Sequence, residues 1–171
     1  MTAELRVLRD QDDRSGFRSG DEALDLFFHV YAGQNQFRHH IGVSYLTVEE
    51  GRILGFLTVS TATLDAEVLP GGRTMPPYPL PVLRVARLAT DERARGRGVG
   101  RGLLRFAIEL AERQRDEVGC VGVLVDAKPD AVDSCARLGF VELEALAGGS
   151  PALPRPTPMF VSLGSVPRGP R

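Results

Sequence analysis

The chain has 171 residues, a formal net charge of −1 and a hydrophobic fraction of 43%. This length suits one domain with a sizeable core, and the apolar content excludes wholesale disorder. No run of about eighteen apolar residues occurs, so no membrane-spanning helix is predicted, and a net charge near zero gives no overall attraction to nucleic acid.

The amino terminus and the cysteines indicate where in the cell the protein is expected and whether it binds a metal. Met1–Arg6 contains no apolar stretch of the kind that directs secretion. Cys120 and Cys135 do not have the spacing of a metal-binding pair, so we interpret them as reduced thiols. We therefore expect a cytoplasmic protein with no bound metal.

The first predicted elements are a short strand over Leu5–Leu8 and a helix. Ser19 and Glu22 have the spacing of a capping box, with Ser19 as the N-cap of the helix, and Gly33 is interpreted as its end. One helix face is expected to be buried, because apolar residues recur at helical spacing: Leu24, Phe27, Phe28 and Tyr31.

Two apolar, β-branched runs follow, Ile41–Val48 and Ile53–Thr61, and the turn residues Glu49–Arg52 between them predict a hairpin. A loop is predicted over residues 70–79, because its prolines cannot donate the hydrogen bonds of a helix or an inner strand. Val82–Ala89 predicts the next strand.

The apolar period then changes to that of a helix, beginning at Val99. The remaining predicted elements are a strand over Val121–Val125, a helix over Pro129–Leu138, and strands over Phe140–Leu143 and Met159–Leu163.

This order of elements predicts an α/β or α+β sandwich with a mixed central sheet. We expect a single domain over residues 1–163 and a disordered tail over residues 164–171.

A glycine-rich segment, Arg95-Gly96-Arg97-Gly98-Val99-Gly100, lies between a predicted strand and a predicted helix. Glycine allows close approach of the backbone to a ligand, and a helix start offers free N–H groups and a positive dipole end. Together these features predict a pyrophosphate site, to which Arg95, Arg97 and Arg101 would add charge-assisted contacts. The alternative is an arginine-rich surface turn that caps the helix. The spacing fits neither a dinucleotide fingerprint nor a Walker loop.

Positive charge is concentrated around this segment. Between residues 84 and 115 there are nine arginines and four acidic residues, a local excess of five positive charges. Arginine suits phosphate recognition because its guanidinium is a rigid fork of donors. The arginines are Arg84, Arg87, Arg93, Arg95, Arg97, Arg101, Arg105, Arg113 and Arg115.

Arg95-x-x-Gly98-x-Gly100, preceded by the strand 85–90, resembles the coenzyme A motif of the GCN5-related N-acetyltransferases. The resemblance implies a sandwich whose sheet, flanked by helices, splays between the strands 82–89 and 121–125, with acetyl-CoA as cofactor. The Leu88 amide would face the oxyanion of the reacting thioester. The implied cofactor-binding residues are Leu88, Ala89, Thr90, Arg95, Gly96, Arg97, Gly98, Val99, Gly100 and Arg101.

Three separate segments, Ser15–Phe27, Ala32–Gln36 and Pro79–Ala89, resemble the acetyltransferase toxins of bacterial toxin–antitoxin pairs. Those toxins acetylate the α-amino group of aminoacyl-tRNA, so the resemblance implies tRNA as substrate and an antitoxin partner. A homodimer is a further expectation. Arg84, Arg87 and Arg93 are the expected substrate-binding residues. A small-molecule or peptide amine is the alternative acceptor, because the global charge is near neutral.

The chain departs from the family at Cys135. Many members carry Tyr-x-x-x-Gly-Phe, whose tyrosine protonates the departing thiolate, whereas this chain has Cys135-Ala136-Arg137-Leu138-Gly139-Phe140. Cys135 is either a short-reach acid or a small buried apolar residue. Tyr78 is either a substitute acid or a loop anchor. Loss of the tyrosine leaves open a further alternative, a weakly active CoA-binding module or attenuated toxin.

The histidines and one aspartate are further candidates. His29 and the pair His39–His40 have no cluster of acids or cysteines near them in the sequence, so a metal site is not predicted. The pair is either an exposed surface feature or a general base. Asp126, at the end of a predicted strand, either orients a substrate amine or caps a turn.

Overall fold

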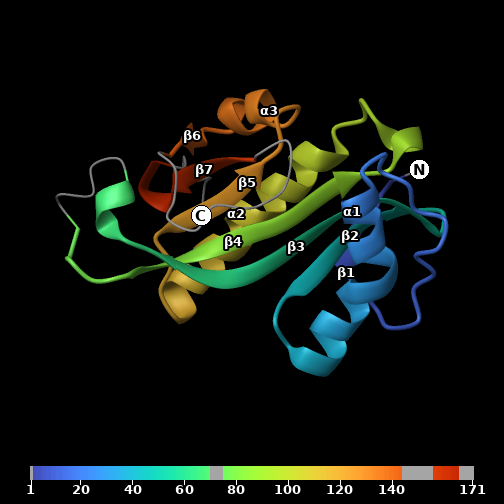
Figure 1. The fold of residues 1–171 in the computed structure, drawn as a ribbon, viewed down its shortest axis with the longest axis horizontal. Coiled ribbons are helices and arrows are strands. Elements are labelled where there is room, and N and C mark those ends of the chain that lie inside the picture. Colours follow the sequence, from blue (N-terminus) through green and yellow to red (C-terminus); the bar gives the residue numbers. More distant parts are fainter. Residues whose placement is uncertain (1, 70–74, 144–155, 166–171) are drawn as a thin grey trace. The chain divides into compact units, whose positions relative to one another are not determined.

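The chain is described by a computed structural model over residues 2–69, 75–143 and 156–165. The strands within these ranges are β1 Glu4–Val7, β2 Val43–Glu49, β3 Arg52–Leu64, β4 Leu80–Thr90, β5 Gly122–Ala127, β6 Val141–Glu142 and β7 Thr157–Ser162. They form one sheet in the order β1-β2-β3-β4-β5-β7-β6 (Figure 1). β4 and β5 are parallel, and the pairs β1–β2, β2–β3, β5–β7 and β6–β7 are antiparallel. The predicted α+β fold with a mixed sheet is confirmed, while its splay stays a prediction.

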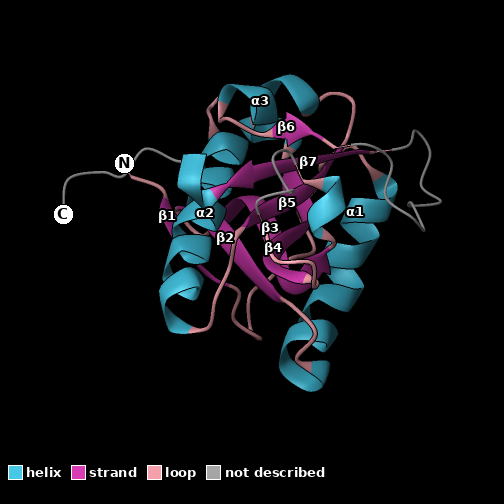
Figure 2. Ribbon diagram, turned by 90° about the vertical axis from the view of Figure 1, so that its left-hand side faces the viewer, coloured by secondary structure: helices cyan, strands magenta, loops and turns pink. Residues whose placement is uncertain are grey.

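Helices accompany the strands (Figure 2). They are of three kinds. The α-helices are α1 Glu22–Leu26, α2 Val99–Glu117 and α3 Val132–Arg137, with π-helical segments at Phe27–Tyr31 and Gln34–His39 and 3₁₀ turns at Ala66–Val68, Glu92–Ala94 and Leu163–Ser165. No helix of the described residues is both long and apolar enough to cross a membrane.

The chain divides into two compact units. The first consists of Met1–Ser60 and Val85–Phe106, and the second of Thr61–Arg84 and Ala107–Arg171. β3, β4 and α2 therefore each contribute residues to both units.

The core of the first unit is built on stacked phenylalanines. Phe28 lies flat against Phe56, with ring centroids 4.2 Å apart and planes 6° from parallel. Phe17 meets both rings edge-on, at 4.9 and 5.5 Å. Such aromatic pairs each add about 1 kcal/mol beyond the area that they bury. The cluster holds the helical stretch 22–39 against β2 and β3. Its other buried members are Leu8, Phe27, Ala32, Leu46 and Ala89.

This helical stretch differs from its prediction at both ends. Its N-cap is Asp21, whose carboxylate accepts hydrogen bonds from the amides of Ala23 and Leu24, and not Ser19. Ser19 instead donates its hydroxyl hydrogen to Asp25 at 2.7 Å. The reason is that Gly20, with φ of 91°, turns the chain between Ser19 and the helix.

The prediction that Gly33 ends the helix is wrong. Gly33 has ordinary right-handed dihedrals, φ −66° and ψ −44°, and the helix continues to His40, whose left-handed φ of 54° ends it. The π-helical segments also shift the apolar period, since a π turn holds more residues than an α turn. Phe27 and Phe28 are buried as expected, but Tyr31 is 46% exposed.

The β2–β3 hairpin is confirmed. Val43 pairs with Val59, and Glu49 pairs with Arg52 beside the turn. Glu50 and Gly51 have φ of 51° and 76°, as a tight two-residue turn between twisted strands requires.

In the second unit, β5 pairs with β7 along its length, and β7 also pairs with β6. Gly122 begins β5 where no side chain fits, because a Cβ there would lie 2.3 Å from the Val161 carbonyl oxygen. α3 begins at Val132, later than the predicted Pro129, because the Ala131 amide first closes a turn onto the Lys128 carbonyl at 2.8 Å. Residues 70–74 of the predicted loop and 166–171 of the predicted tail lie outside the described residues.

Candidate functional site

The segment between β4 and α2 is built from a capped turn and two glycines. Asp91 follows β4 and caps the 3₁₀ turn Glu92–Ala94 by accepting a hydrogen bond from the Arg93 amide at 2.9 Å. Gly96 and Gly98 then have φ of 80° and 78° before α2 begins. Residues with side chains rarely adopt such dihedrals, so glycine is required at both positions.

This loop has the properties of an anion cradle. Nothing lies within 4 Å of where a Cβ would stand on Gly96 or Gly98, so the backbone there is open to a ligand. The first N–H groups of α2 have no partner within the helix, and they carry the positive end of its dipole. Residues 95–100, predicted to hold a pyrophosphate, are therefore brought into a geometry that fits one.

A close contact between β3 and α2 positions the start of the helix. A Cβ on Gly55 would stand 2.6 Å from Val99 Cγ1, 3.0 Å from the Ala89 carbonyl oxygen and 3.3 Å from Leu103 Cδ1. Only glycine at this strand position allows the first turn of α2 to pack this closely. Gly55 thus supports the loop from behind without belonging to it.

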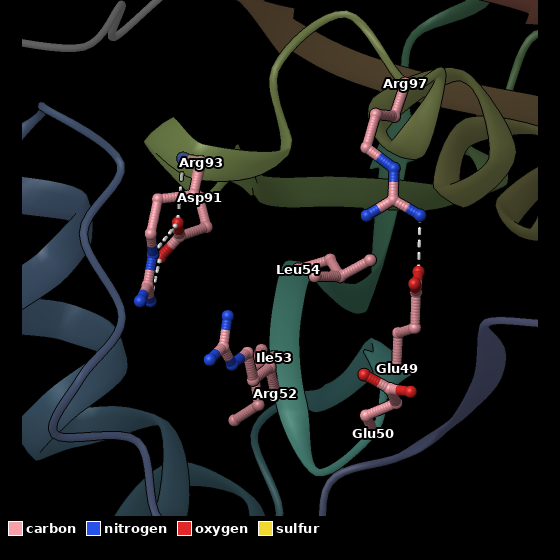
Figure 3. A pocket seen from close by; sticks show the side chains of 8 residues that line it. All are labelled: Glu49, Glu50, Arg52, Ile53, Leu54, Asp91, Arg93 and Arg97. Atoms are coloured by element: carbon pink, nitrogen blue, oxygen red, sulfur yellow. Dashed lines mark hydrogen bonds and ion pairs between the residues drawn. The ribbon is translucent and has the colours of Figure 1, made fainter. Parts of the chain in front are cut away.

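The arginines of the loop are already engaged. Arg95 Nη2 donates to the Ser19 carbonyl oxygen at 2.6 Å, and Arg97 forms an ion pair with Glu49 at the end of β2. In Figure 3, the Arg97 guanidinium points toward Glu49 across a hollow. Its lining is Glu49, Glu50, Arg52, Ile53, Leu54, Asp91, Arg93 and Arg97. Any anion that recruits Arg97 must compete with the Glu49 carboxylate.

The three predicted substrate-binding arginines also have partners. Arg93 Nε donates to Asp91 at 3.0 Å, and the Arg87 guanidinium lies 3.9 Å above the centre of the Phe27 ring. In the second unit, Arg84 pairs with Asp126 at 2.7 Å. Their role in substrate binding stays a prediction, and it requires that they exchange or share these partners.

Asp91 is the most buried charged residue of the first unit, with 2% exposure. Its Oδ2 accepts from the Arg18 amide at 3.1 Å, while Oδ1 accepts from the Arg93 amide and guanidinium. Burial by itself raises the pKa of this carboxyl, but the hydrogen bonds from Arg93 and Arg18 outweigh it and hold the pKa below its ordinary value. Asp91 is therefore ionised at neutral pH.

Cys135, the position of the usual tyrosine, belongs to the second unit. Its side chain is fully buried in α3, and burial raises the pKa of the thiol. A protonated thiol without solvent exposure has the properties of a small apolar core residue. This placement favours the structural alternative for Cys135.

Comparison with known proteins now identifies the family. A family model described as "Acetyltransferase (GNAT) family" matches residues 5–140. The chain belongs to the GNAT acetyltransferases. The match extends through β4, the glycine loop, α2 and β5, so the loop lies within the family region. The chain is thus an acetyltransferase by family, as its sequence predicted.

Within this family, the chain is similar to proteins named as toxins. A "tRNA-acetylating toxin" of Mycobacterium tuberculosis is 35% identical over 128 residues, which cover 73% of this chain and 75% of that protein. A structure of AtaT complexed with acetyl-methionyl-tRNAfMet has a TM-score of 0.82 at 24% identity, covering 96% of each chain. A mutant AtaT toxin bound to the C-terminus of the antitoxin AtaR and acetyl-CoA has a TM-score of 0.75 at 23% identity, covering 95% of this chain and 94% of that one. At these identities the two structures show a shared fold.

The structure also places the other side chains that the sequence singled out. Tyr78 is exposed. His29 places a ring nitrogen 2.8 Å from the Phe17 carbonyl oxygen, and His40 ends the helical stretch. Within the described ranges, no cluster of three acids, cysteines or histidines could hold a metal ion.

Sequence reasoning missed three residues that shape the acetyltransferase loop: Asp91, Glu49 and Gly55. Asp91 had a detectable signal, since an aspartate directly after a strand and before a turn often caps that turn. The sequence pattern indicates a hairpin turn at Glu49 and a strand at Gly55, and nothing more. Their contacts join positions more than 30 residues apart, such as Glu49 and Arg97, so local patterns could not predict them.

Proposed function

We propose that the chain transfers an acetyl group from acetyl-CoA to the α-amino group of an aminoacyl-tRNA. The observation that carries the proposal is the 35% identity to a tRNA-acetylating toxin within a matched acetyltransferase family. The two positive-φ glycines and the open backbone of the loop support the cofactor half of the proposal.

Acetyl-CoA would be held by the β4–α2 connection. The amides of residues 95–100 and the side chain of Arg101 would take the pyrophosphate, and Leu88, Ala89 and Thr90 at the end of β4 would flank the pantetheine arm. Gly100 leaves space beside the Thr90 hydroxyl, which is 3.6 Å from where a Cβ would stand. The cofactor supplies an activated thioester, and the chain positions it.

The acceptor chemistry requires only weak assistance from a general base. A free α-amino group titrates at about 7.7–8.0, so a neutral amine is present near neutral pH. Positioning that amine on the thioester carbonyl then accounts for most of the required rate enhancement, with the Leu88 amide as a donor to the oxyanion. Such a site does not require Cys135 to act.

Arginines beyond those near the cofactor support an RNA acceptor. Arg84, Arg87 and Arg93 would contact the tRNA backbone, which makes binding fall steeply with added salt. A single-stranded acceptor end presents its amine without base-specific readout.

An antitoxin and a second copy of this chain are the proposed protein partners, and a tRNA substrate places the activity in the cytoplasm. Because the family match continues through both units, we treat residues 1–163 as one acetyltransferase domain.

A weakly active CoA-binding module is the second candidate. The full burial of Cys135 favours it, because no phenol stands at the family's usual acid position. Under this alternative the chain binds acetyl-CoA but turns over slowly with every acceptor amine.

The decisive experiment supplies the protein with acetyl-CoA and a mixed pool of aminoacyl-tRNAs. Nuclease digestion followed by mass spectrometry then identifies acetylated aminoacyl adenosines. We expect one or a few amino acids to be acetylated by the natural chain and none by Gly98→Glu. Acetylation of small amines or peptides alone would replace tRNA as the acceptor. Cofactor binding without turnover on any amine would favour the binding module.

A further inference from the structure

Two hydrogen bonds connect the backbone of Arg18 to the start of the cofactor loop. The Arg18 amide donates to Asp91 Oδ2 at 3.1 Å, and the Arg18 carbonyl oxygen accepts from the Glu92 amide at 2.8 Å. The two positions are 73 residues apart in sequence. The backbone N–H and C=O of Arg18 are therefore both hydrogen-bonded to the segment that leads into residues 95–100.

Asp91 is itself fixed from two further directions. Its amide donates to the Leu54 carbonyl oxygen on β3 at 2.8 Å, and its Oδ1 accepts from Arg93. A buried carboxylate with this many donors has one orientation. Asp91 thus joins β3, the loop and Arg18 in one network.

The same region makes two more contacts farther along the loop. Arg95 Nη2 donates to the Ser19 carbonyl oxygen at 2.6 Å. At Gly20, a Cβ would stand 2.8 Å from Arg95 Nη2 and 2.9 Å from Glu92 Oε1, so the two segments are in close contact there. Arg95, a predicted phosphate ligand, is therefore also an anchor of the segment 16–20.

This anchor continues into the helical stretch. The Ser19 amide and hydroxyl both donate to Asp25 Oδ1, at 2.9 and 2.7 Å, and Asp25 lies in α1. A change in the loop that moves Ser19 thus acts directly on the first turn of the helix.

We propose that Asp91 is a positioning residue that links the cofactor loop to residues 16–25, so that acetyl-CoA binding orders the start of the helical stretch. The inference rests on the proposed cofactor. Because such coupling is reciprocal, loosening the link must also weaken cofactor binding. Couplings of this kind commonly amount to about fivefold or more in affinity.

The test uses Asp91→Asn, with Asp12→Asn as the matched control. Asparagine keeps the shape of Asp91 but turns one acceptor into an NH₂ group, which faces either the Arg18 amide or the Arg93 guanidinium. Asp12 is also ion-paired to an arginine, Arg6, at 2.8 Å, and none of its hydrogen bonds in the described chain reaches the loop.

Hydrogen exchange with mass spectrometry measures the protection of backbone amides in peptides covering residues 15–27 and 91–101. The measurement is made with and without saturating acetyl-CoA. In the natural chain and in Asp12→Asn, acetyl-CoA should protect both peptides. In Asp91→Asn it should protect only residues 91–101, with affinity reduced at least about fivefold in a calorimetric titration. A purely structural role would lower stability without this ligand-dependent difference.

Two results would overturn the inference even though acetyl-CoA binds. One is protection of residues 91–101 without residues 15–27 in the natural chain, a result that needs no variant to fold. The other is a folded Asp91→Asn that matches the natural chain in affinity and protection. A natural chain that binds no acetyl-CoA would instead overturn the cofactor proposal, and this inference with it.

Discussion

Gly98 and Gly102, four residues later, differ in backbone conformation. Both have open space where a Cβ would stand, but Gly98 has φ of 78° and Gly102 lies within α2. Alanine at position 98 should cost about 1–2 kcal/mol of stability, because a side chain disfavours the left-handed region. Alanine at position 102 should add about 0.5–1 kcal/mol, because glycine is a poor helix former.

The glutamate variants at these two positions test the cradle itself. Gly98→Glu should abolish acetyl-CoA binding in a calorimetric titration, since it places a carboxylate beside the phosphates. Gly102→Glu serves as the control and should keep affinity within a few-fold. Equal losses at both positions would mean that added charge near α2, and not the cradle, governs binding.

Glu49 competes with the cofactor for Arg97. Replacing Glu49 by glutamine removes the charge that holds the guanidinium, so acetyl-CoA should bind about two- to fivefold more tightly, in line with the small energies of exposed ion pairs. Glu50→Gln is the matched control, because Glu50 lines the same hollow and is not paired with Arg97. The difference should shrink at high salt; an unchanged or weaker affinity in Glu49→Gln would exclude the competition.

Cys135 and Cys120 are both buried, which makes one a control for the other. If Cys135 only fills the core, Cys135→Ala and Cys120→Ala should each lose about 1 kcal/mol of stability, and kcat and its pH profile should stay unchanged. If Cys135 protonates the leaving thiolate, only Cys135→Ala should lose kcat, by about a hundredfold, at unchanged acetyl-CoA affinity. Steady-state kinetics on the proposed tRNA substrate distinguish these outcomes.

The contact between β3 and α2 makes Gly55 a support of the loop. Gly55→Ala should destabilise the chain by about 1–3 kcal/mol in urea unfolding, because the new Cβ meets Val99 and the Ala89 carbonyl oxygen. It should also weaken acetyl-CoA binding, because the start of α2 must shift. A variant with lowered stability and unchanged affinity would show that the cradle tolerates this shift.

The strands and α2 could largely be predicted from the sequence, but the first helical stretch could not. Alternating β-branched runs around Glu49–Arg52 predicted the hairpin, and the change of apolar period at Val99 predicted the start of α2. Between residues 27 and 39 the π turns break the period of 3.6 residues, so Tyr31 was placed on the wrong face. Gly33 was interpreted as a stop signal, because nothing local shows that packing carries the helix past it.

In the candidate site, too, features with a local sequence signal could be predicted and features that depend on distant contacts could not. The glycine loop was predictable because its signal lies within six consecutive residues. The partners of its arginines were not, since Arg95–Ser19 and Arg97–Glu49 each join distant parts of the chain. The functional roles of these residues stay predictions until the variants above are measured.

The stability of the whole chain should be highest over a plateau between about pH 4 and pH 8.5. Hydrogen bonds from Arg6 lower the pKa of Asp12, and those from Arg93 and Arg18 lower that of Asp91 against the effect of burial, so their stabilisation is lost as pH falls below about 4. Burial raises the pKa of both cysteine thiols, so stability should also fall as the unfolded thiols ionise above about pH 8.5.

Urea unfolding across this pH range measures both limits. Asp12→Asn and Asp91→Asn should each be less stable on the plateau and should flatten the acid limb. The two cysteine-to-alanine variants should flatten the alkaline limb. If the acid limb is as steep in both asparagine variants as in the natural chain, other carboxyl groups cause the loss of stability at low pH.

The two compact units alternate along the chain, with boundaries after Ser60, Arg84 and Phe106. A single recombination between two genes of this type therefore always leaves at least one unit assembled from both parents. Neither unit can be inherited, duplicated or lost as one continuous stretch of coding sequence. A crossover between codons 18 and 91 brings Arg18 and Asp91 from different parents, so contacts of this kind within a unit must stay compatible across distant codons.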